Sequence, residues 1–326
     1  MYAVWYDRTG PADQVLTFGE VAMPVPGPEE VRVRVYASGV NPSDTKRRGG
    51  DIPVAFPRVI PHSDGAGVIE AVGTAVSPAR IGERVWLWNA QFGRPSGTAA
   101  EYVVVPSVQA VHLPDTVDFA VGACLGIPAL TAHRCVFADG PVQGQTILID
   151  GGAGAVGHAA IQLAKWGGAT VIATVSSAEK AEVASVGGAD SVLHYKDEDV
   201  IARVEEITGK KGIDRAIDVA FGQNVKRNVS LLKINGTIAA YGSDDIPYPQ
   251  LPFFELLRKD ITVHFVLVYI ISPAARERGL ADVNSALESG ALRPIIAARF
   301  PLRETAQAHQ AVESGKVIGN VVIDVA

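Results

Sequence analysis

The chain has 326 residues, more than one ordinary hydrophobic core accommodates and enough for two domains. Hydrophobic residues make up 48% of the chain and charged residues 20%, which is the balance of a globular protein and excludes a disordered one. The net charge of −6 favours neither nucleic acid nor an anionic membrane as a partner, and two cysteines, Cys124 and Cys135, are too few for a disulfide scaffold.

The N-terminal sequence MYAVWYDRTG has neither the basic stretch nor the apolar block of a secretory signal. The longest apolar run, Ile261–Ile271, is too short to cross a bilayer. We therefore expect a cytoplasmic protein without a membrane partner.

The first third of the chain is predicted to be rich in short strands. Val31, Val33 and Val35 alternate with Arg32 and Arg34, which is the period of a half-buried strand. Further strand-like runs, separated by glycine and proline, are Gly67–Val72, Arg84–Trp88 and Glu101–Val105. This spacing predicts a small barrel or sandwich.

From about Val121 the pattern changes to strands alternating with helices. The predicted strands are Thr146–Asp150, Thr170–Thr174, Ser191–Leu193, Ala216–Val219, Thr237–Tyr241 and Thr262–Leu267. The predicted helices are Gly157–Trp166, Ala178–Val186, Asp197–Thr208, Gln223–Leu232 and Phe253–Leu257. Such alternation is typical of a doubly wound parallel sheet. The tail breaks this rhythm, and we expect it to return to the first domain. Its predicted elements are helices Ala274–Ser289 and Arg303–Glu313, and strands Pro294–Phe300 and Val321–Val325.

A glycine-rich turn joins the first of these strands to its helix. Gly152, Gly154 and Gly157 satisfy the G-x-G-x-x-G spacing, and the turn follows a strand and opens a helix, as a dinucleotide site requires. The glycines allow a tight turn and let backbone amides approach a pyrophosphate at the helix N-terminus.

The end of the next strand indicates which dinucleotide binds. A site for NAD normally places Asp or Glu there to hold the ribose 2′-hydroxyl. This chain has Thr174 to Ser177 instead, with Lys180 on the following turn. Hydroxyl groups and a lysine can accept a 2′-phosphate, whereas the nearest acid, Glu179, lies where it would cap a helix. The sequence therefore predicts NADPH.

Motifs along essentially the whole chain resemble those of the medium-chain dehydrogenase/reductase superfamily, specifically its zinc-independent zeta-crystallin/quinone oxidoreductase branch. In order they are GVNPSD (39–44), DGAGVIEAVG (64–73), IGERVW (81–86), GTAAEYVVV (97–105), LGIPALTAHR (125–134), GGAGAVG (151–157) and KGIDRAIDVAFG (211–222). The resemblance implies an α/β protein with a GroES-like, β-rich catalytic domain formed by residues 1–122 and 265–326. A Rossmann NADP-binding domain, residues 123–264, would be inserted between these parts, with the nicotinamide in a cleft. Members of the branch are usually homodimers or homotetramers joined through the edge of the Rossmann sheet, for which Ile261–Ile271 is the candidate.

The resemblance also assigns site residues by position. Asn41 and Thr131 would line the nicotinamide and the substrate, with Asp44 and Thr45 on the same wall. The cofactor-binding set comprises Gly152, Ala153, Gly154, Ala155, Val156 and Gly157 in the turn, Ser176, Lys180 and Tyr195 at the 2′-phosphate, Tyr241, Gly242, Ser243, Phe265, Val266 and Leu267 along the nicotinamide half, and Asn320 before the last strand.

No metal site is expected. Zinc-dependent relatives have a cysteine within the segment matching Gly39–Asp44, a histidine at the position of Ser63 and a cysteine at that of Ile127. All three ligands are absent here, and His62 is offset by one residue, so we interpret it as a turn histidine. Without a Lewis acid, simple alcohols are poor substrates. A quinone or enone can spread the charge of an accepted hydride onto oxygen, where Asn41 or Thr131 could donate hydrogen bonds.

The substrate class is the least defined expectation. Many relatives have a tyrosine where this chain has Lys46, and the run Lys46–Arg48 could attract an anionic acceptor such as a CoA thioester or form a solvated loop. Trp88 could stack on a flat quinone or face a core. The alternatives to a quinone reductase are therefore an enoyl-thioester reductase, and a structural, sensing or RNA-binding protein that binds NADPH with little catalysis.

Overall fold

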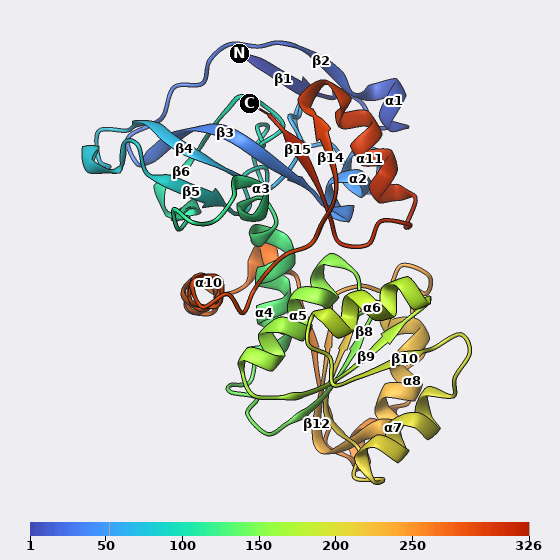
Figure 1. The fold of residues 1–326 in the computed structure, drawn as a ribbon. Coiled ribbons are helices and arrows are strands. Elements are labelled where there is room, and N and C mark those ends of the chain that lie inside the picture. Colours follow the sequence, from blue (N-terminus) through green and yellow to red (C-terminus); the bar gives the residue numbers. More distant parts are fainter. Residues whose placement is uncertain (52, 326) are drawn as a thin grey trace. The chain divides into compact units, whose positions relative to one another are not determined.

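The computed structural model describes residues 1–51 and 53–325, and the chain divides into two compact units. The first unit consists of Met1–Ile127 and Pro294–Ala326, and the second of Pro128–Arg293 (Figure 1). The second boundary therefore lies near residue 294 and not at 265 as expected from the sequence.

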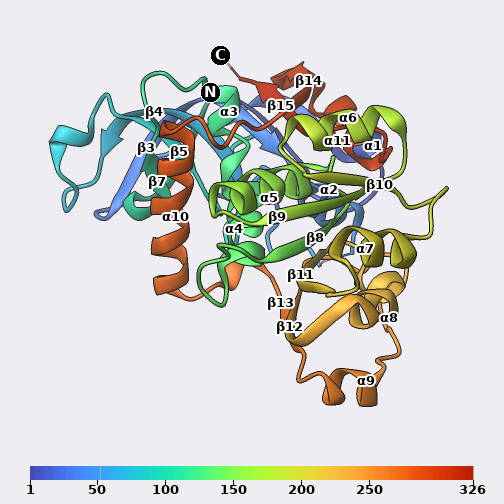
Figure 2. The same cartoon turned by 60° about the horizontal axis from the view of Figure 1, so that its bottom comes forward.

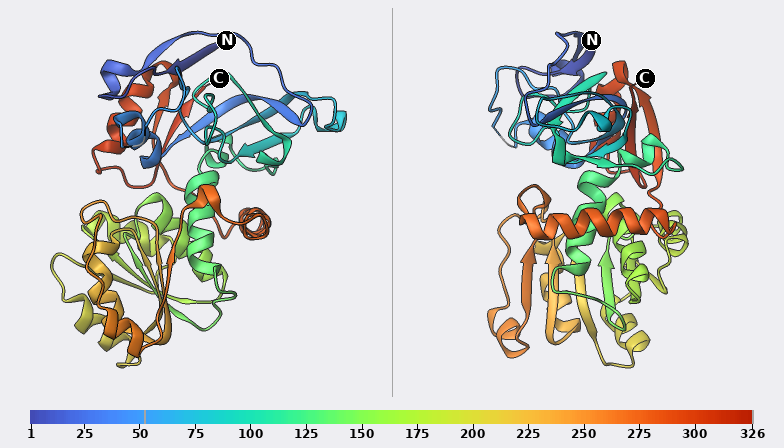
Figure 3. Two further views of the ribbon diagram at one scale, coloured as in Figure 1. Left: turned by 180° about the vertical axis from the view of Figure 1, so that it is seen from behind. Right: turned by 90° about the vertical axis from the view of Figure 1, so that its left-hand side faces the viewer.

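The reason for this correction is the helix α10 (Pro273–Glu288), which packs against α4 (Leu130–Phe137) within the second unit (Figure 3, right). The two helices are joined by a 2.7 Å hydrogen bond between His133 Nε2 and Asp282 Oδ2. At Gly279 an added Cβ would lie 3.2 Å from Leu130, so glycine permits the close approach of the helices.

In the first unit, the strand β3 (Glu30–Val40) pairs antiparallel with three others, β4, β6 and β15. The sheet order is β14-β15-β3-β4-β5-β7, and a separate hairpin-like pair joins β1 to β2. The other strands are β1 (Tyr2–Trp5), β2 (Thr17–Glu20), β4 (Asp64–Val72), β5 (Arg84–Leu87), β6 (Tyr102–Pro106), β7 (Ala110–His112), β14 (Ile296–Pro301) and β15 (Asn320–Asp324). The tail thus returns to the first unit, through β14 and β15.

The core of this unit follows the alternation seen in the sequence. Val31, Val33 and Val35 are fully buried, and they pack against Ile69, Val85 and Val103 from the neighbouring strands. The helices of this unit include α1 (Ala12–Val15), α2 (Pro42–Gly49), α3 (Phe119–Gly122) and α11 (Thr305–Glu313). The helix α11 packs against α2 and against the strands β14 and β15.

The second unit is a parallel six-stranded sheet in the order β10-β9-β8-β11-β12-β13, which confirms the doubly wound prediction. Its strands are β8 (Thr146–Asp150), β9 (Thr170–Val175), β10 (Ser191–His194), β11 (Ile213–Asp218), β12 (Leu232–Ala240) and β13 (Thr262–Phe265). The helix α5 (Ala155–Trp166) packs against α4 on one side and against α6 (Ala178–Val186) on the other. A second layer contains α7 (Val200–Thr208), α8 (Phe221–Leu231) and α9 (Phe253–Arg258), as Figure 2 shows.

The strand order reverses between β8 and β11. Connections leave these neighbouring strands in opposite directions, which opens a crevice at their carboxyl ends where such sheets bind ligands. The glycine-rich turn follows β8 at this point. No helix in the described parts of the chain is long and apolar enough to cross a membrane.

Candidate cofactor site and polar cluster

The turn after β8 has little room for side chains, with one exception. A Cβ added to Gly157 would lie 2.2 Å from the carbonyl oxygen of Gly151, and one added to Gly152 would lie 2.9 Å from Ala173 Cβ. Gly151 itself has a φ of 73°. At Gly154 the nearest atom would be 3.5 Å away, an ordinary contact. Gly154 therefore leaves open space at the N-terminus of the 12-residue helix α5, where backbone amides favour an anion.

A buried polar network lies next to this turn, around Asp150. Asp150, the last residue of β8, accepts a hydrogen bond from Thr174 (2.8 Å) and one from Arg227 (2.6 Å). Asn228 donates to both Asp150 (3.2 Å) and Asp218 (2.9 Å), the last residue of β11. Burial and the nearby Asp150 charge raise the pKa of Asp218. The network joins the strands that flank the switch point, and no local pattern in the sequence predicts it.

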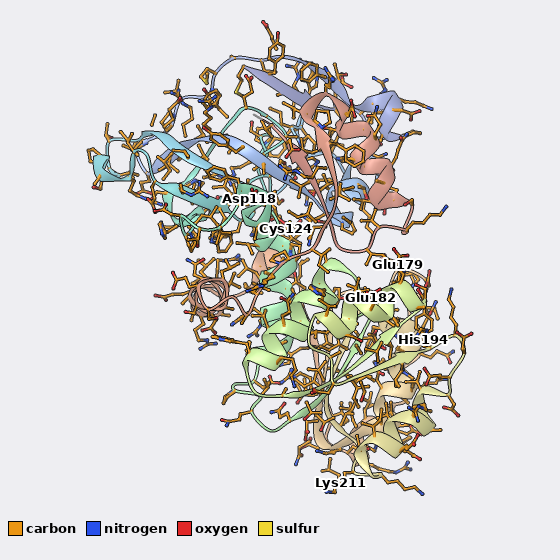
Figure 4. The ribbon with its side chains drawn as sticks, in the orientation of Figure 1. Asp118, Cys124, Glu179, Glu182, His194 and Lys211 are labelled. Atoms are coloured by element: carbon orange, nitrogen blue, oxygen red, sulfur yellow. The ribbon has the colours of Figure 1, made fainter. Side chains whose placement is uncertain are left out.

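The three residues expected at a 2′-phosphate come from two adjacent strand ends. Ser176 follows β9 and accepts a 3.1 Å hydrogen bond from Lys180 Nζ on α6. Tyr195 follows the neighbouring strand β10, and its backbone N–H donates to Val175 O. Its side chain is about half exposed. Glu179 lies exposed in the first turn of α6, next to the N-cap Ser177 (Figure 4). The strand end therefore carries a lysine and hydroxyl groups.

A pocket of about 260 Å³ lies at the carboxyl ends of β12 and β13. Its lining residues are Phe221, Ala240, Tyr241, Gly242, Ser243, Phe265, Val266 and Leu267. All six residues expected along the nicotinamide half are in this set, and Phe221 and Ala240 were missed. The Phe221 ring meets Phe265 edge to face, with centroids 5.3 Å apart, and closes one wall of the pocket.

Asn41, Asp44 and Thr45 lie together in the first unit, at the start of α2. Asn41 is the N-cap and Pro42 occupies the first helical position, so the sequence NPSD is a local helix start. Asp44 Oδ2 accepts from the Asn41 backbone N–H at 2.8 Å. Burial raises the pKa of Asp44 to about 7. Thr45 donates its hydroxyl proton to Pro42 O at 3.0 Å.

Asp64 completes this cluster and was not among the predicted site residues. Its side chain is fully buried, and its Oδ2 accepts from Asn41 Nδ2 (2.8 Å) and from the Ile127 N–H (2.9 Å). Burial raises the pKa of Asp64 well above its ordinary value. A Cβ on Gly126 would lie 2.2 Å from Asp64 Oδ1, so only glycine fits there. An aspartate followed by Gly65 and Gly67 at the start of a strand was the available signal.

Thr131 and Asn320 belong to different units. Thr131 belongs to the second unit, on α4, and is 6% exposed. Asn320 begins β15 in the first unit, and both its backbone N–H and its Nδ2 donate to Ile295 O, at 2.8 and 2.9 Å. The Asn320 side chain thus fixes the chain where it enters the final strands.

The three residues of the basic run Lys46–Arg48 have different surroundings. Arg48 is 2% exposed and binds Gly10 O and the carboxylate of Glu313 on α11, so it is a structural ion pair and not a substrate contact. Arg47 donates to Gln91 Oε1, while Lys46 is half-buried. Trp88 is likewise half-buried, just beyond β5.

Within residues 1–51 and 53–325, no group of three or more His, Cys, Asp and Glu side chains is placed to hold a metal ion. Cys124 donates a hydrogen bond to Ala120 O (3.2 Å) and lies near α3 (Figure 4). Burial raises the pKa of Cys135 to about 12 and that of Cys124 further. His62 has a φ of 78°, and its ring is fully buried.

Comparison with known proteins agrees with this geometry. Residues 27–115 match the family model "Alcohol dehydrogenase GroES-like domain", and residues 155–282 match "Zinc-binding dehydrogenase". The chain is 30% identical to human quinone oxidoreductase over 298 residues, covering 91% of this chain and 89% of the relative. It is 31% identical to a 2-haloacrylate reductase of Burkholderia sp. over 333 residues, covering 99% and 98%. A mycobacterial protein solved with NADPH, Rv1454c, superposes with a TM-score of 0.88 at 30% identity and 100% coverage of both chains.

Proposed function

Because the chain belongs to the quinone oxidoreductase branch of the medium-chain dehydrogenase/reductase family, we propose that it transfers hydride from NADPH to a quinone or an α,β-unsaturated carbonyl compound. The observation that carries the cofactor half of the proposal is the Lys180–Ser176 pair beside the open turn at Gly154. The acceptor half draws on the names of the human and Burkholderia relatives.

The second unit supplies the residues that would hold the cofactor. Backbone amides from Gly152 to Gly157 would bind the pyrophosphate, and Ser176, Lys180 and Tyr195 would bind the 2′-phosphate. The pocket bounded by Tyr241–Ser243 and Phe265–Leu267 would take the nicotinamide half. NADPH, when bound, supplies the hydride.

The first unit supplies polar groups for the acceptor. Asp64 holds one amide hydrogen of Asn41, which fixes the plane of that amide. We assign to the Asn41 amide and the Thr131 hydroxyl the hydrogen bonds that stabilise charge on the acceptor oxygen. The Thr45 hydroxyl donates to Pro42 O, so Thr45 contributes to the wall and not a proton. The final proton comes from solvent.

No metal enters the proposed reaction. Ser63 and Ile127 stand where zinc-dependent members of the family have a histidine and a cysteine, and neither side chain is a zinc ligand. Activated acceptors need no Lewis acid, because their conjugated systems delocalise the negative charge.

Of the two proposed acceptor classes, the α,β-unsaturated carbonyl compound is supported by the 2-haloacrylate reductase among the relatives. The thioester alternative loses its main support, since Arg48 is buried in an ion pair with Glu313. NADPH oxidation, followed with a chelator present, should be compared for 1,4-benzoquinone, 9,10-phenanthrenequinone, a simple enone and crotonyl-CoA. We expect the quinones or the enone to be reduced. NADPH binding without turnover of any acceptor would instead favour a binding protein.

The apolar surface of the second unit supports self-association. β13 is an edge strand, and Phe253, Phe254 and Leu257 on α9 are each more than 60% exposed. We propose a homo-oligomer joined through β13 and α9, located in the cytoplasm.

A further inference from the structure

A chain of buried polar side chains in the first unit leads from α11 to the Asn41–Asp64 cluster. His309 Nε2 lies 2.9 Å from His62 Nε2, and His62 Nδ1 lies 2.8 Å from Ser38 Oγ. Ser38 Oγ lies 2.7 Å from Thr98 Oγ1, which bonds to the backbone carbonyl of Asp64. His62, Ser38, Thr98 and His309 are all fully buried.

The direction of every bond in this chain follows from proton counting. The Asp64 carbonyl can only accept, so Thr98 donates its single hydroxyl proton there, and Ser38 must donate to Thr98. Ser38 has then no proton left, so His62 Nδ1–H donates to Ser38. A neutral His62 therefore has a bare Nε2, which accepts from His309 Nε2–H. All bonds run one way, from His309 to Asp64.

Both rings are held in the neutral form that this arrangement needs. Burial lowers the pKa of His62 to about 3. Burial, His62 and the guanidinium group of Arg48 lower the pKa of His309 well below its ordinary value. Arg48 faces His309 from α2, and its own counterion is Glu313, one turn further along α11.

The backbone of His62 indicates that its ring is required. Its φ of 78° lies in the left-handed region, where a non-glycine residue is strained. Glycine would adopt this conformation without strain but would leave Ser38 without its donor. Strain of this kind persists where the surrounding contacts over-determine it.

We propose that His309 and His62 are positioning residues, whose one-way hydrogen-bond chain fixes Asp64 and through it the Asn41 amide. Asp64 is the point of connection, because its carbonyl ends the chain and its carboxyl group accepts from Asn41 Nδ2. The chain ends on a backbone carbonyl, so it orients groups and does not relay a proton to the carboxyl of Asp64. The inference rests on the proposed role of Asn41, but its first test does not depend on activity.

The first test is ¹⁵N NMR of the histidine side chains at pH 7.5, assigned with His62→Gln and His309→Gln. The expected result is a neutral His62 protonated at Nδ1 and a neutral His309 protonated at Nε2. A charged ring, or either ring in the opposite tautomer, would overturn the chain whether or not the protein reduces quinones.

The second test compares His309→Leu, which removes the donor, with His309→Gln, which keeps an N–H donor. We expect the leucine variant to shift and broaden the Asn41 side-chain amide signals and to lower kcat about tenfold, with KM for NADPH unchanged. The glutamine variant should restore both readouts. His133→Leu, another buried histidine, is the matched control because His133 and Thr131 are two residues apart and do not share a face of α4.

Each remaining outcome is decisive. If His309→Leu leaves the Asn41 signals in place and matches His133→Leu in kcat, the positioning role is wrong. If the wild-type protein oxidises no NADPH, the proposed function fails, and the Asn41 signals alone decide the positioning role. If His309→Leu does not fold, Thr98→Val breaks the chain at its other end, with Thr98→Ser as the control that keeps the hydroxyl.

Discussion

The ammonium group of Lys180 donates to the hydroxyl of Ser176 across 3.1 Å, where a site for NAD would place an acidic residue. Both residues flank the N-cap of α6, and Tyr195 follows the adjacent strand. This pair is the structural basis of the expected preference for NADPH.

Lys180→Ala should therefore raise KM for NADPH and leave KM for NADH unchanged, since only NADPH has the 2′-phosphate. A hydrogen bond to a charged group contributes about 1.5–3 kcal/mol, which corresponds to an increase of about tenfold or more. Steady-state kinetics with both cofactors measure this. Glu182→Gln on the same helix is the control, because Glu182 is exposed and has the opposite charge (Figure 4). Equal changes for the two cofactors would show that Lys180 does not contact the phosphate.

Two substitutions in the glycine-rich turn should distinguish an effect on folding from an effect on cofactor binding. Gly157→Ala places a Cβ 2.2 Å from Gly151 O and should destabilise the protein by several kcal/mol, about the cost of forced overpacking. Gly154→Ala meets nothing closer than 3.5 Å at a φ of −75°, so its fold should be intact. We expect weaker NADPH binding by Gly154→Ala, measured by calorimetry, with an unchanged urea midpoint. Wild-type affinity in this variant would place the pyrophosphate elsewhere.

The apolar residues of α9 should hold the oligomer together. Phe253→Glu combined with Phe254→Glu is expected to yield a species of about 34 kDa in light scattering, because both rings are more than 60% exposed in the single chain. Val186→Glu on α6 is the control, since Val186 is 80% exposed near the opposite edge of the sheet. A wild-type protein that is already monomeric contradicts this assembly.

The buried histidine pair also predicts the acid stability. Its native pKa values lie below the ordinary value of 6.5, so the unfolded chain binds protons that the native chain does not. Stability is therefore complete above pH 6.5 and falls as the pH decreases toward the native pKa values. Protonation of one such ring in the unfolded chain should lower the free energy of unfolding by about 2 kcal/mol between pH 7.5 and pH 5. The wild-type protein has two such rings and His309→Gln has one, so urea unfolding should show a smaller loss of stability in the variant. Equal losses in the two proteins would contradict the predicted role of the histidine pair.

The elements with strong local patterns could be predicted from the sequence. The strand Thr146–Asp150 and the helix Ala178–Val186 occur with the predicted bounds, because periodicity and the adjacent glycine and serine residues define them locally. The helix predicted from Asp197 begins at Val200 instead, because Asp199 caps it with bonds to Ile201 and Ala202.

What could not be predicted depends on partners far along the chain. In the sequence, Arg48 resembles part of a solvated basic run. In the structure it pairs with Glu313, which lies 265 residues later in the chain. His62 meets His309 at a separation of 247 residues, and no local signal connects them. Likewise, α10 belongs to the second unit through its packing against α4, which includes the hydrogen bond between His133 and Asp282. Burial and ion pairing between residues so far apart in the sequence depend on the tertiary structure, and local periodicity does not predict them.

The central claim is tested most directly by the rate at which the purified wild-type protein oxidises NADPH with 1,4-benzoquinone in the presence of a chelator. The account predicts saturable turnover that the chelator does not reduce and that is much slower with NADH. Binding of NADPH without turnover of the quinone, or activity abolished by the chelator, would contradict it.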